Sequence, residues 1–419
     1  MLGTKNKAEF AWAMYDWANS AFSTTIQAAL LPIFFKDVAA ANLEPFVSTS
    51  YWGYTQSVAM IIAVVLAPVL GAIADHAALR KRLMVFFVTT GAFFTASLFT
   101  VDKGEFLLCS VLYVAANVAF ASANVFYDSF LPAVTSRDRM DWLSSLGYAY
   151  GYVGGGLLFL INIVMVLKPG LFFLKSPVDG MKLSFVTVGL WWFGFTVPFM
   201  RHVKEEKVGY KIKISTSIKE GFRRIFETFK EIRKHREAFL MLIAYWFYID
   251  AVGTIIKMAV VYGKDVGVPN EHLMGALLLT QFVAFPFAIL YGRIAWKLGT
   301  KKALYLSILV YLFIMIWGYF LKSAWEFWAL ALLVVTSQGG VQALSRSLFG
   351  RMVPHGKRAE FFGFFSVFSK FATVAGPAIY GFAAQLTRNS RSGIIFLIIF
   401  LLIGLALLSR VRTEEASKT

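Results

Sequence analysis

Apolar runs of about twenty residues recur from one end of the chain to the other, separated by short polar or charged segments. A helix of that length crosses a hydrocarbon core of about 30 Å. The pattern predicts an all-α integral membrane protein with twelve transmembrane helices. The predicted spans are residues 11–35, 51–74, 83–101, 106–128, 144–167, 183–200, 239–262, 273–295, 303–321, 325–348, 361–384 and 393–409.

One long polar segment, residues 201–238, separates the first six predicted spans from the last six. We therefore predict an N-terminal six-helix bundle over residues 1–200, a cytoplasmic linker over 201–238 and a C-terminal bundle over 239–419. Apolar residues recur in the linker at helical spacing among Lys and Arg, which predicts either an amphipathic helix on an anionic leaflet or a plain linker helix. These residues are Ile218, Phe222, Ile225, Phe226 and Phe229.

The connections between the spans carry an uneven charge. With an even number of spans they form two alternating sets, of which the set containing both termini holds 30 Lys and Arg residues and the other set 9. Cytoplasmic loops carry the excess of Lys and Arg in membrane proteins. Both termini are therefore predicted to lie in the cytoplasm.

The amino-acid composition is that of a membrane protein and not of an average soluble domain. Of the 419 residues, 58% are hydrophobic and 16% charged, against about 25% charged in an average soluble domain. The net charge of +17 comes from Lys and Arg between the spans, so we expect no nucleic-acid partner. Cys109 is the single cysteine, and no phosphate-binding loop, metal-ligand spacing or nucleophile motif occurs. We expect no cofactor, and a monomer whose partners are a small-molecule solute and the lipid bilayer.

Polar residues inside the predicted spans fall mainly on every third span. In the first and fourth spans their spacing places them on one face of a helix. Polar side chains are costly in lipid and normally face the bundle interior or a water-filled cavity. They are Asp16, Asn19, Ser20, Ser23 and Gln27 in the first span, and Tyr113, Asn117, Asn124 and Asp128 in the fourth.

The seventh and tenth spans carry similar stripes. If the four polar faces converge, they enclose a hydrophilic cavity for a solute near the bilayer midplane. Singly, each residue is as well explained by a hydrogen bond to a neighbouring helix, and Asp250 with Lys257 by an ion pair. Asp250 is the best candidate for a titrating site. The stripes are Asp250, Thr254 and Lys257, then Gln338, Gln342, Ser345 and Arg346.

Three further charged residues have two interpretations each. Lys370 lies about ten residues into the eleventh span, where it either reaches the cytoplasm or faces an acid or the cavity. Asp16 and Asp128 lie near cytoplasmic helix ends, where each either holds an arginine as a gate or anchors a helix. The arginines within reach are Arg80, Arg137 and Arg139.

Glycines mark close helix contacts and a bend. Gly147, Gly151 and Gly155 follow a repeated small-residue spacing that lets another helix approach. Gly376-Pro377 in the eleventh span predicts a kink that gives a moving element its hinge.

Two cytoplasmic loops repeat a pattern at matching places in the two halves. Each has a glycine near a helix end followed by charged residues, a pattern that can pin two spans together as a gate. The loop residues are Gly71, Asp75 and Arg80 in the first half and Gly292, Lys297 and Gly299 in the second.

These loops resemble the signature of the major facilitator superfamily, and the chain as a whole resembles its vacuole effluxer-like branch. The resemblance rests on residues 11–22, 145–156 and 342–363. It implies two pseudo-symmetric six-helix bundles that work by alternating access, and fungal relatives associated with amino-acid export from the vacuole. The chain departs from the pattern at Ala78-Leu79 and at Trp296, where glycine with a basic residue and an acid are usual. Its short loops favour a bacterial cytoplasmic membrane.

The hypothesis from the sequence is a secondary transporter, not an enzyme. It would export or exchange small amphipathic solutes, amino acids first, coupled to a proton or solute gradient. A lipid or drug exporter of the same fold is the alternative. A membrane-embedded enzyme or sensor would need a clustered catalytic set, and a channel suits the repeated halves less well.

Overall fold

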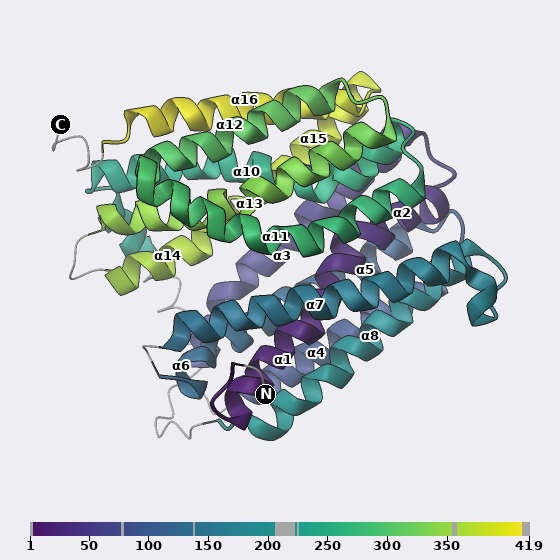
Figure 1. Cartoon of the computed structure of the whole chain (residues 1–419), viewed down its shortest axis with the longest axis horizontal. Helices are drawn as coiled ribbons and strands as arrows, with labels where there is room; N and C mark the ends of the chain where they lie inside the picture. The colour runs from purple at the N-terminus through teal and green to yellow at the C-terminus, as the bar shows by residue number, and fades with distance from the viewer. Residues whose placement is uncertain are drawn as a thin grey trace. The chain divides into compact units, whose positions relative to one another are not determined.

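The computed structural model describes residues 3–76, 79–136, 139–205, 223, 226–353 and 358–412, and all regular structure within them is helical (Figure 1). The chain forms two compact units, each with its own internal contacts. Unit 1 comprises Met1–Glu44 and Ile61–Phe222, and unit 2 comprises Pro45–Met60 and Arg223–Thr419. The all-helical class is as predicted. The predicted domain limits at 200 and 239 remain predictions, and the contacts in addition assign residues 45–60 to unit 2.

Unit 1 begins with a span that is not a uniform α-helix. Between α1 and α2 the residues Phe22–Ala29 form the wider π-helix η1, where the Leu30 N–H donates to the carbonyl of Thr25, five residues back. Residues Phe35–Ala39 form a second, shorter π-helix, η2, directly after α2. The elements are α1 (Lys7–Ala21), η1 (Phe22–Ala29), α2 (Leu30–Phe34), η2 (Phe35–Ala39), α4 (Arg80–Ser97), η3 (Leu98–Thr100), α5 (Phe106–Ser129), α6 (Leu131–Val134), α7 (Met140–Leu167), η5 (Pro169–Phe172) and α8 (Pro177–His202).

Helix α3 (Pro45–His76) contributes its first half to unit 2 and its second half to unit 1. In unit 2 the predicted eleventh span is two helices, because the backbone leaves the helix at residues 372–374. The elements of unit 2 are α10 (Arg236–Asp265), α11 (Asn270–Leu298), α12 (Thr300–Tyr319), α13 (Ala324–Met352), α14 (Arg358–Phe371), α15 (Ala375–Thr387) and α16 (Arg391–Arg410).

Local signals in the sequence explain several helix starts. Ser323 and Glu326 form a capping box at the first turn of α13. Ser176 caps α8, whose first residue is Pro177, a position where the missing N–H costs nothing. Asn6 caps α1 by accepting from the Glu9 N–H.

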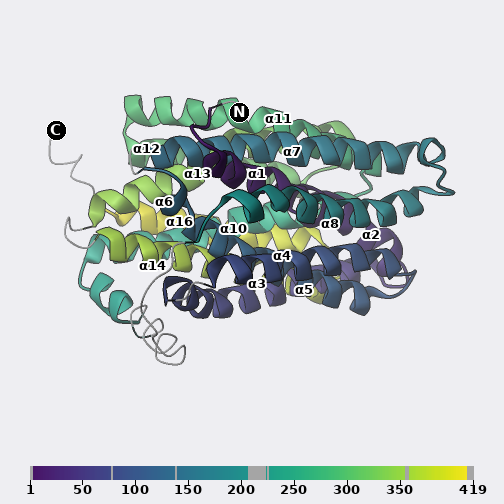
Figure 2. The same ribbon diagram turned by 90° about the horizontal axis from the view of Figure 1, so that it is seen from below.

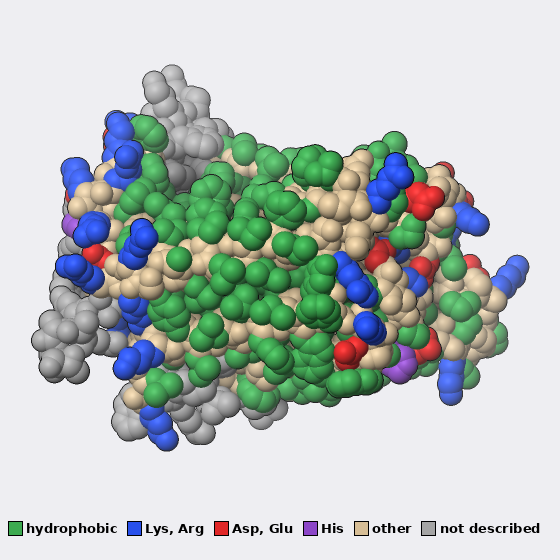
Figure 3. Space-filling model, turned by 90° about the horizontal axis from the view of Figure 1, so that it is seen from above, with side chains coloured by type: hydrophobic (Ala, Val, Ile, Leu, Met, Phe, Trp, Pro, Cys, Tyr) green, Lys and Arg blue, Asp and Glu red, His purple; other side chains and the backbone are tan. Residues whose placement is uncertain are grey.

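Within the described ranges, nine helices are long and apolar enough to cross a membrane. Of the other predicted spans, 11–35 is interrupted by η1, 273–295 lies in α11, and 361–384 is divided between α14 and α15. The count of twelve therefore stays a prediction. On the face shown in Figure 3, hydrophobic side chains cover the middle of the helices and charged ones gather toward their ends, as expected for a protein in lipid.

The same helix pairs recur in the two units. In unit 1, α1 packs against α7 and α8, α4 against α5 and α8, and α7 against α8 (Figure 2). In unit 2, α10 packs against α15 and α16, α12 against α13 and α16, and α15 against α16. Each of these pairs in unit 1 has a counterpart among the pairs just given for unit 2, made by the helices at the same places in the order of spans along the chain. Such a repeat is expected of two related halves.

Candidate functional site

In unit 1 the polar stripes of α1–η1 and α5 face each other and are joined by side-chain hydrogen bonds. Asn19 Nδ2 donates to Asn124 Oδ1 at 3.0 Å. Within η1, Gln27 Nε2 donates to Asn117 Oδ1 at 2.5 Å. The two stripes are thus joined by amide hydrogen bonds, so these four residues connect helices within one unit.

Asp16 continues this polar seam toward the start of α1. Its Oδ2 accepts a hydrogen bond from the Tyr127 hydroxyl at 2.7 Å, and the Tyr127 ring stacks on Trp12 with centroids 4.4 Å apart. Tyr127 was not identified from the sequence, although its position three residues after Asn124 places it on the polar face of the same helix. Asp128, one residue further along α5, is exposed.

The arginine partners considered for Asp16 are placed elsewhere or not described. Arg139 pairs with Glu9 at 3.1 Å, and Arg80 lies with its guanidinium 5.9 Å from the Phe130 ring. Arg137 lies outside the described residues. Among the described residues, Asp16 therefore holds a tyrosine and no arginine.

The glycine series of α7 also lies against α1, at Asp16, Ser20 and Thr24. A Cβ atom added at Gly147 would lie 2.2 Å from Asp16 Oδ2, and one at Gly151 would lie 2.4 Å from Ser20 Oγ. At Gly155 it would lie 3.0 Å from Thr24 Oγ1. The predicted close approach of another helix to these glycines is confirmed.

In unit 2, Asp250 of α10 is fully buried, and neither carboxylate oxygen has a hydrogen-bond partner among the described residues. Its neighbour across the helix contact is Gly376, in the first turn of α15. A Cβ atom at Gly376 would lie 2.7 Å from Asp250 Oδ1 and 1.9 Å from Thr254 Oγ1. The first N–H groups of a helix lack partners inside it and carry partial positive charge, so this half-helix end favours an anionic carboxylate.

Lys257 lies two turns beyond Asp250 on the same helix. Its Nζ donates to the carbonyl of Thr373 at 3.3 Å, in the break between α14 and α15. No ion pair joins Lys257 and Asp250 within the described part of the chain. Ser57 of α3 donates to the carbonyl of Val374 in the same break at 2.8 Å. An acid, a base and an unwound backbone segment thus meet in unit 2.

The remaining predicted residues of unit 2 are more scattered. On α13, Gln338 is half-buried, Gln342 and Arg346 are exposed, and the contact with α10 is made by Ser345, which hydrogen-bonds Tyr248 at 2.6 Å. Lys370 occupies the last turn of α14, where its carbonyl accepts from the Thr373 hydroxyl at 3.1 Å.

The predicted gating loops are described in part. Gly71 and Asp75 belong to the end of α3 and Gly292 to α11, but their side-chain surroundings lie outside the described residues. Lys297 is exposed in the last turn of α11, and Gly299 leads the chain into α12 with φ +84°, a conformation that favours glycine.

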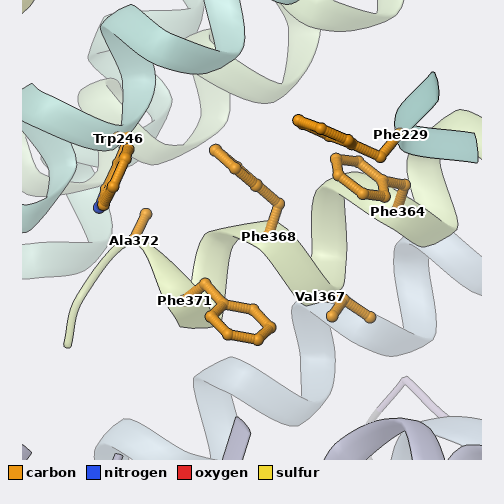
Figure 4. A pocket seen from close by; sticks show the side chains of 7 residues that line it. All are labelled: Phe229, Trp246, Phe364, Val367, Phe368, Phe371 and Ala372. Carbon is orange, nitrogen blue, oxygen red and sulfur yellow. The ribbon is translucent and has the colours of Figure 1, made fainter. Parts of the chain in front are cut away.

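An open aromatic pocket of about 240 Å³ lies beside the α14–α15 break (Figure 4). Trp246, one helical turn before Asp250, stands on one side of it, and the side chains of α14 stand on the other. Trp246 is 45% exposed and Phe371 is 48% exposed. The lining residues are Phe229, Trp246, Phe364, Val367, Phe368, Phe371 and Ala372.

A second acid of unit 2, half-buried at the end of a span, was not identified from the sequence. Asp265 ends α10 and accepts hydrogen bonds from the hydroxyls of Thr49 on α3 and Ser390 before α16. The predicted span ended at residue 262, so this acid was counted with a loop. Its partners come from distant segments, and no local pattern identifies them.

Comparison with known proteins agrees with this architecture. The family model described as vacuole effluxer Atg22 like matches residues 44–419. The uncharacterized MFS-type transporter YxiO of Bacillus subtilis is 40% identical over 420 residues, which cover 100% of this chain and 97% of that protein. Autophagy-related protein 22 of Pichia angusta is 27% identical over 413 residues, covering 85% of this chain and 73% of its own length.

Solved structures share the fold. The nucleoside transporter NupG superposes with a TM-score of 0.69 at 12% identity, covering 96% of this chain and 97% of its own. A D-xylose-proton symporter superposes with a TM-score of 0.66 at 13% identity, covering 97% of each chain. The chain therefore belongs to the vacuole effluxer Atg22-like family, and it is an integral, multi-pass membrane transporter of the major facilitator type.

Proposed function

We propose that this transporter moves a small zwitterionic solute, amino acids first, by alternating access, and that Asp250 couples the movement to a proton gradient. The observation that carries the proposal is the buried carboxyl of Asp250, which has no hydrogen-bond partner among the described residues and faces the start of a half-helix. Burial makes an ionised carboxylate costly, and the N–H groups at the start of the half-helix offset only part of that cost, so protonation and deprotonation change its interactions strongly.

The neighbours of Asp250 match the chemistry of an amino acid. Lys257 offers an ammonium to a solute carboxylate, Asp250 offers a carboxylate to a solute ammonium, and the break at 372–374 adds backbone groups between them. Discontinuous helices bind substrates and coupling ions in this way in other secondary transporters. The aromatic pocket one turn away accommodates an apolar side chain.

The location and direction follow from different observations. The bacterial relative at 40% identity supports a bacterial cytoplasmic membrane. The excess of Lys and Arg in one set of loops supports cytoplasmic termini. The effluxer description of the family supports export or exchange rather than uptake.

A test of the coupling role compares two kinds of transport in proteoliposomes. In Asp250→Asn, a side chain of the same size no longer exchanges a proton, so accumulation driven by an imposed pH gradient should fall at least about tenfold. Solute exchange without net proton movement should be weaker but should persist, because the amide oxygen of Asn still accepts a hydrogen bond from the solute ammonium. The control is Asp102→Asn, whose carboxylate is 77% exposed in unit 1. Normal gradient-driven accumulation by Asp250→Asn would show that the acid is structural.

Export of lipids or drugs is a second candidate, favoured by one observation. The aromatic pocket is lined only by apolar side chains among the residues described, and two of its aromatic rings are about half exposed. A hydrophobic solute would use this pocket without the charged pair. Transport of a lipid analogue that survives replacement of both Asp250 and Lys257 would select this candidate.

A further inference from the structure

A second pocket, of about 230 Å³, lies in unit 1 where the start of α1 meets the end of α8. Three of its lining residues are basic and three are apolar. Lys7 stands at the first position of α1, and Arg201 and His202 form the last turn of α8. The lining residues are Lys7, Phe10, Val197, Pro198, Arg201 and His202.

The three basic side chains have no anionic partner among the described residues, and all three are exposed. The acid nearest in sequence on α1, Glu9, is already occupied by Arg139, the Thr135 hydroxyl and the Lys5 N–H. Like charges held around one pocket repel one another unless an anion lies between them. The pocket is therefore complementary to a negatively charged group.

The apolar half continues along α8 into the membrane-spanning part of the helix. Pro198 lies inside the helix and has no N–H to give to the carbonyl of Gly194, one turn deeper. A Cβ atom at Gly194 would meet nothing within 4 Å, and Phe193 beside it is 40% exposed. An open track thus leads from the cationic rim along an apolar helix face.

We propose that this pocket binds an anionic phospholipid, with the phosphate between Lys7, Arg201 and His202 and one acyl chain along Phe10, Val197 and Gly194. Basic pockets at the ends of transmembrane helices recognise lipid head groups in this way. A free phosphate would use only the cationic half of the lining. A lipid uses both halves.

The test measures thermal unfolding of the purified protein in detergent with short-chain phosphatidylglycerol, phosphatidylcholine or inorganic phosphate. Phosphatidylglycerol should raise the unfolding temperature of the wild type by about 2 °C or more, because a ligand that binds only the folded state stabilises it. Phosphatidylcholine and phosphate should not. The variant Lys7→Gln, Arg201→Gln, His202→Gln should lose the shift.

The matched control removes three exposed cations elsewhere in unit 1, with Lys103→Gln, Lys168→Gln and Lys175→Gln. This control should keep the full shift. Equal shifts in the wild type and the pocket variant, or equal loss in the control, would overturn the proposal in favour of general charge attraction. An equal shift with inorganic phosphate would overturn it in favour of a simple anion site. Native mass spectrometry adds a direct readout, since one bound phosphatidylglycerol should be retained by the wild type and the control only.

Discussion

Asp16 and Asp250 are both acids within transmembrane helices, but their surroundings differ. The carboxylate of Asp16 accepts from the Tyr127 hydroxyl, whereas that of Asp250 has no side-chain donor among the described residues and faces only the backbone of Gly376 at the start of α15. A satisfied acid stabilises a helix contact, and an unsatisfied one is a site whose charge state affects function. We therefore assign Asp16 to packing in unit 1 and keep Asp250 for transport.

The contact of Asp16 gives a first prediction. Tyr127→Phe removes the hydroxyl that satisfies Asp16 and should lower the free energy of unfolding by about 1–2 kcal/mol. Tyr152→Phe is the control, because the Tyr152 hydroxyl has no described hydrogen bond. Thermal unfolding of the two variants in one detergent makes the comparison, and equal losses would contradict the role given to Tyr127.

The glycine contacts of α7 give a second prediction. Gly147→Ala would place a methyl group 2.2 Å from Asp16 Oδ2, so either Asp16 gives up its hydrogen bond to Tyr127 or α1 and α7 separate, and the unfolding temperature should fall. Gly194→Ala is the control in α8, where the added methyl group meets nothing within 4 Å. There the change should be neutral or stabilising by up to about 1 kcal/mol, because alanine favours a helix. A similar loss in both variants would count against the close contact.

At the scale of elements, the lengths of the apolar runs predicted the helices. They did not predict the irregularities within those helices. The π-turns of η1 and the break at 372–374 depend on which backbone hydrogen bonds form when the helices pack together. Gly376-Pro377 indicated a kink but not a complete interruption, which lies just before it. The spacing of polar residues predicts which face of a helix is polar, but it does not predict where the backbone leaves the helix.

The candidate site was predictable to the same extent. Stripe residues such as Asn19 and Asn124 were identified, but the pairs they form depend on the vertical register of two helices. Tyr127 and Asp265 were missed because an aromatic residue in a span and an acid at its end are both common. The two pockets involve residues far apart in the sequence, and no local spacing predicts them.

The crossing of α3 and α15 inside unit 2 gives a third prediction. A Cβ atom at Gly53 would lie 2.3 Å from the backbone carbonyl oxygen of Pro377, which cannot rotate away. Gly53→Ala should therefore destabilise the protein and weaken transport. In the control Gly318→Ala, the nearest atom to the added Cβ is 3.9 Å away on Leu330. Unchanged unfolding of Gly53→Ala would show that the two helices are not held this closely.

At the scale of the whole molecule, the uneven distribution of Lys and Arg predicts the topology. Labelling of single cysteines tests this topology. The cysteines are introduced one at a time into the variant Cys109→Ala, in which the one native thiol has been removed. A cysteine at Gly170, in η5, should react with a membrane-impermeant thiol reagent in intact cells. A cysteine at Lys234, which is exposed before α10, should react only after the cells are permeabilised. The reverse pattern would place both termini outside.

The most direct test of the central claim is counterflow in proteoliposomes loaded with a mixture of amino acids. Entry of each labelled amino acid is followed with the wild type and with empty liposomes as the blank. We expect exchange of a defined subset, richest in those with apolar side chains that suit the aromatic pocket. No exchange above empty liposomes, with folded protein confirmed by thermal unfolding, would contradict amino-acid transport.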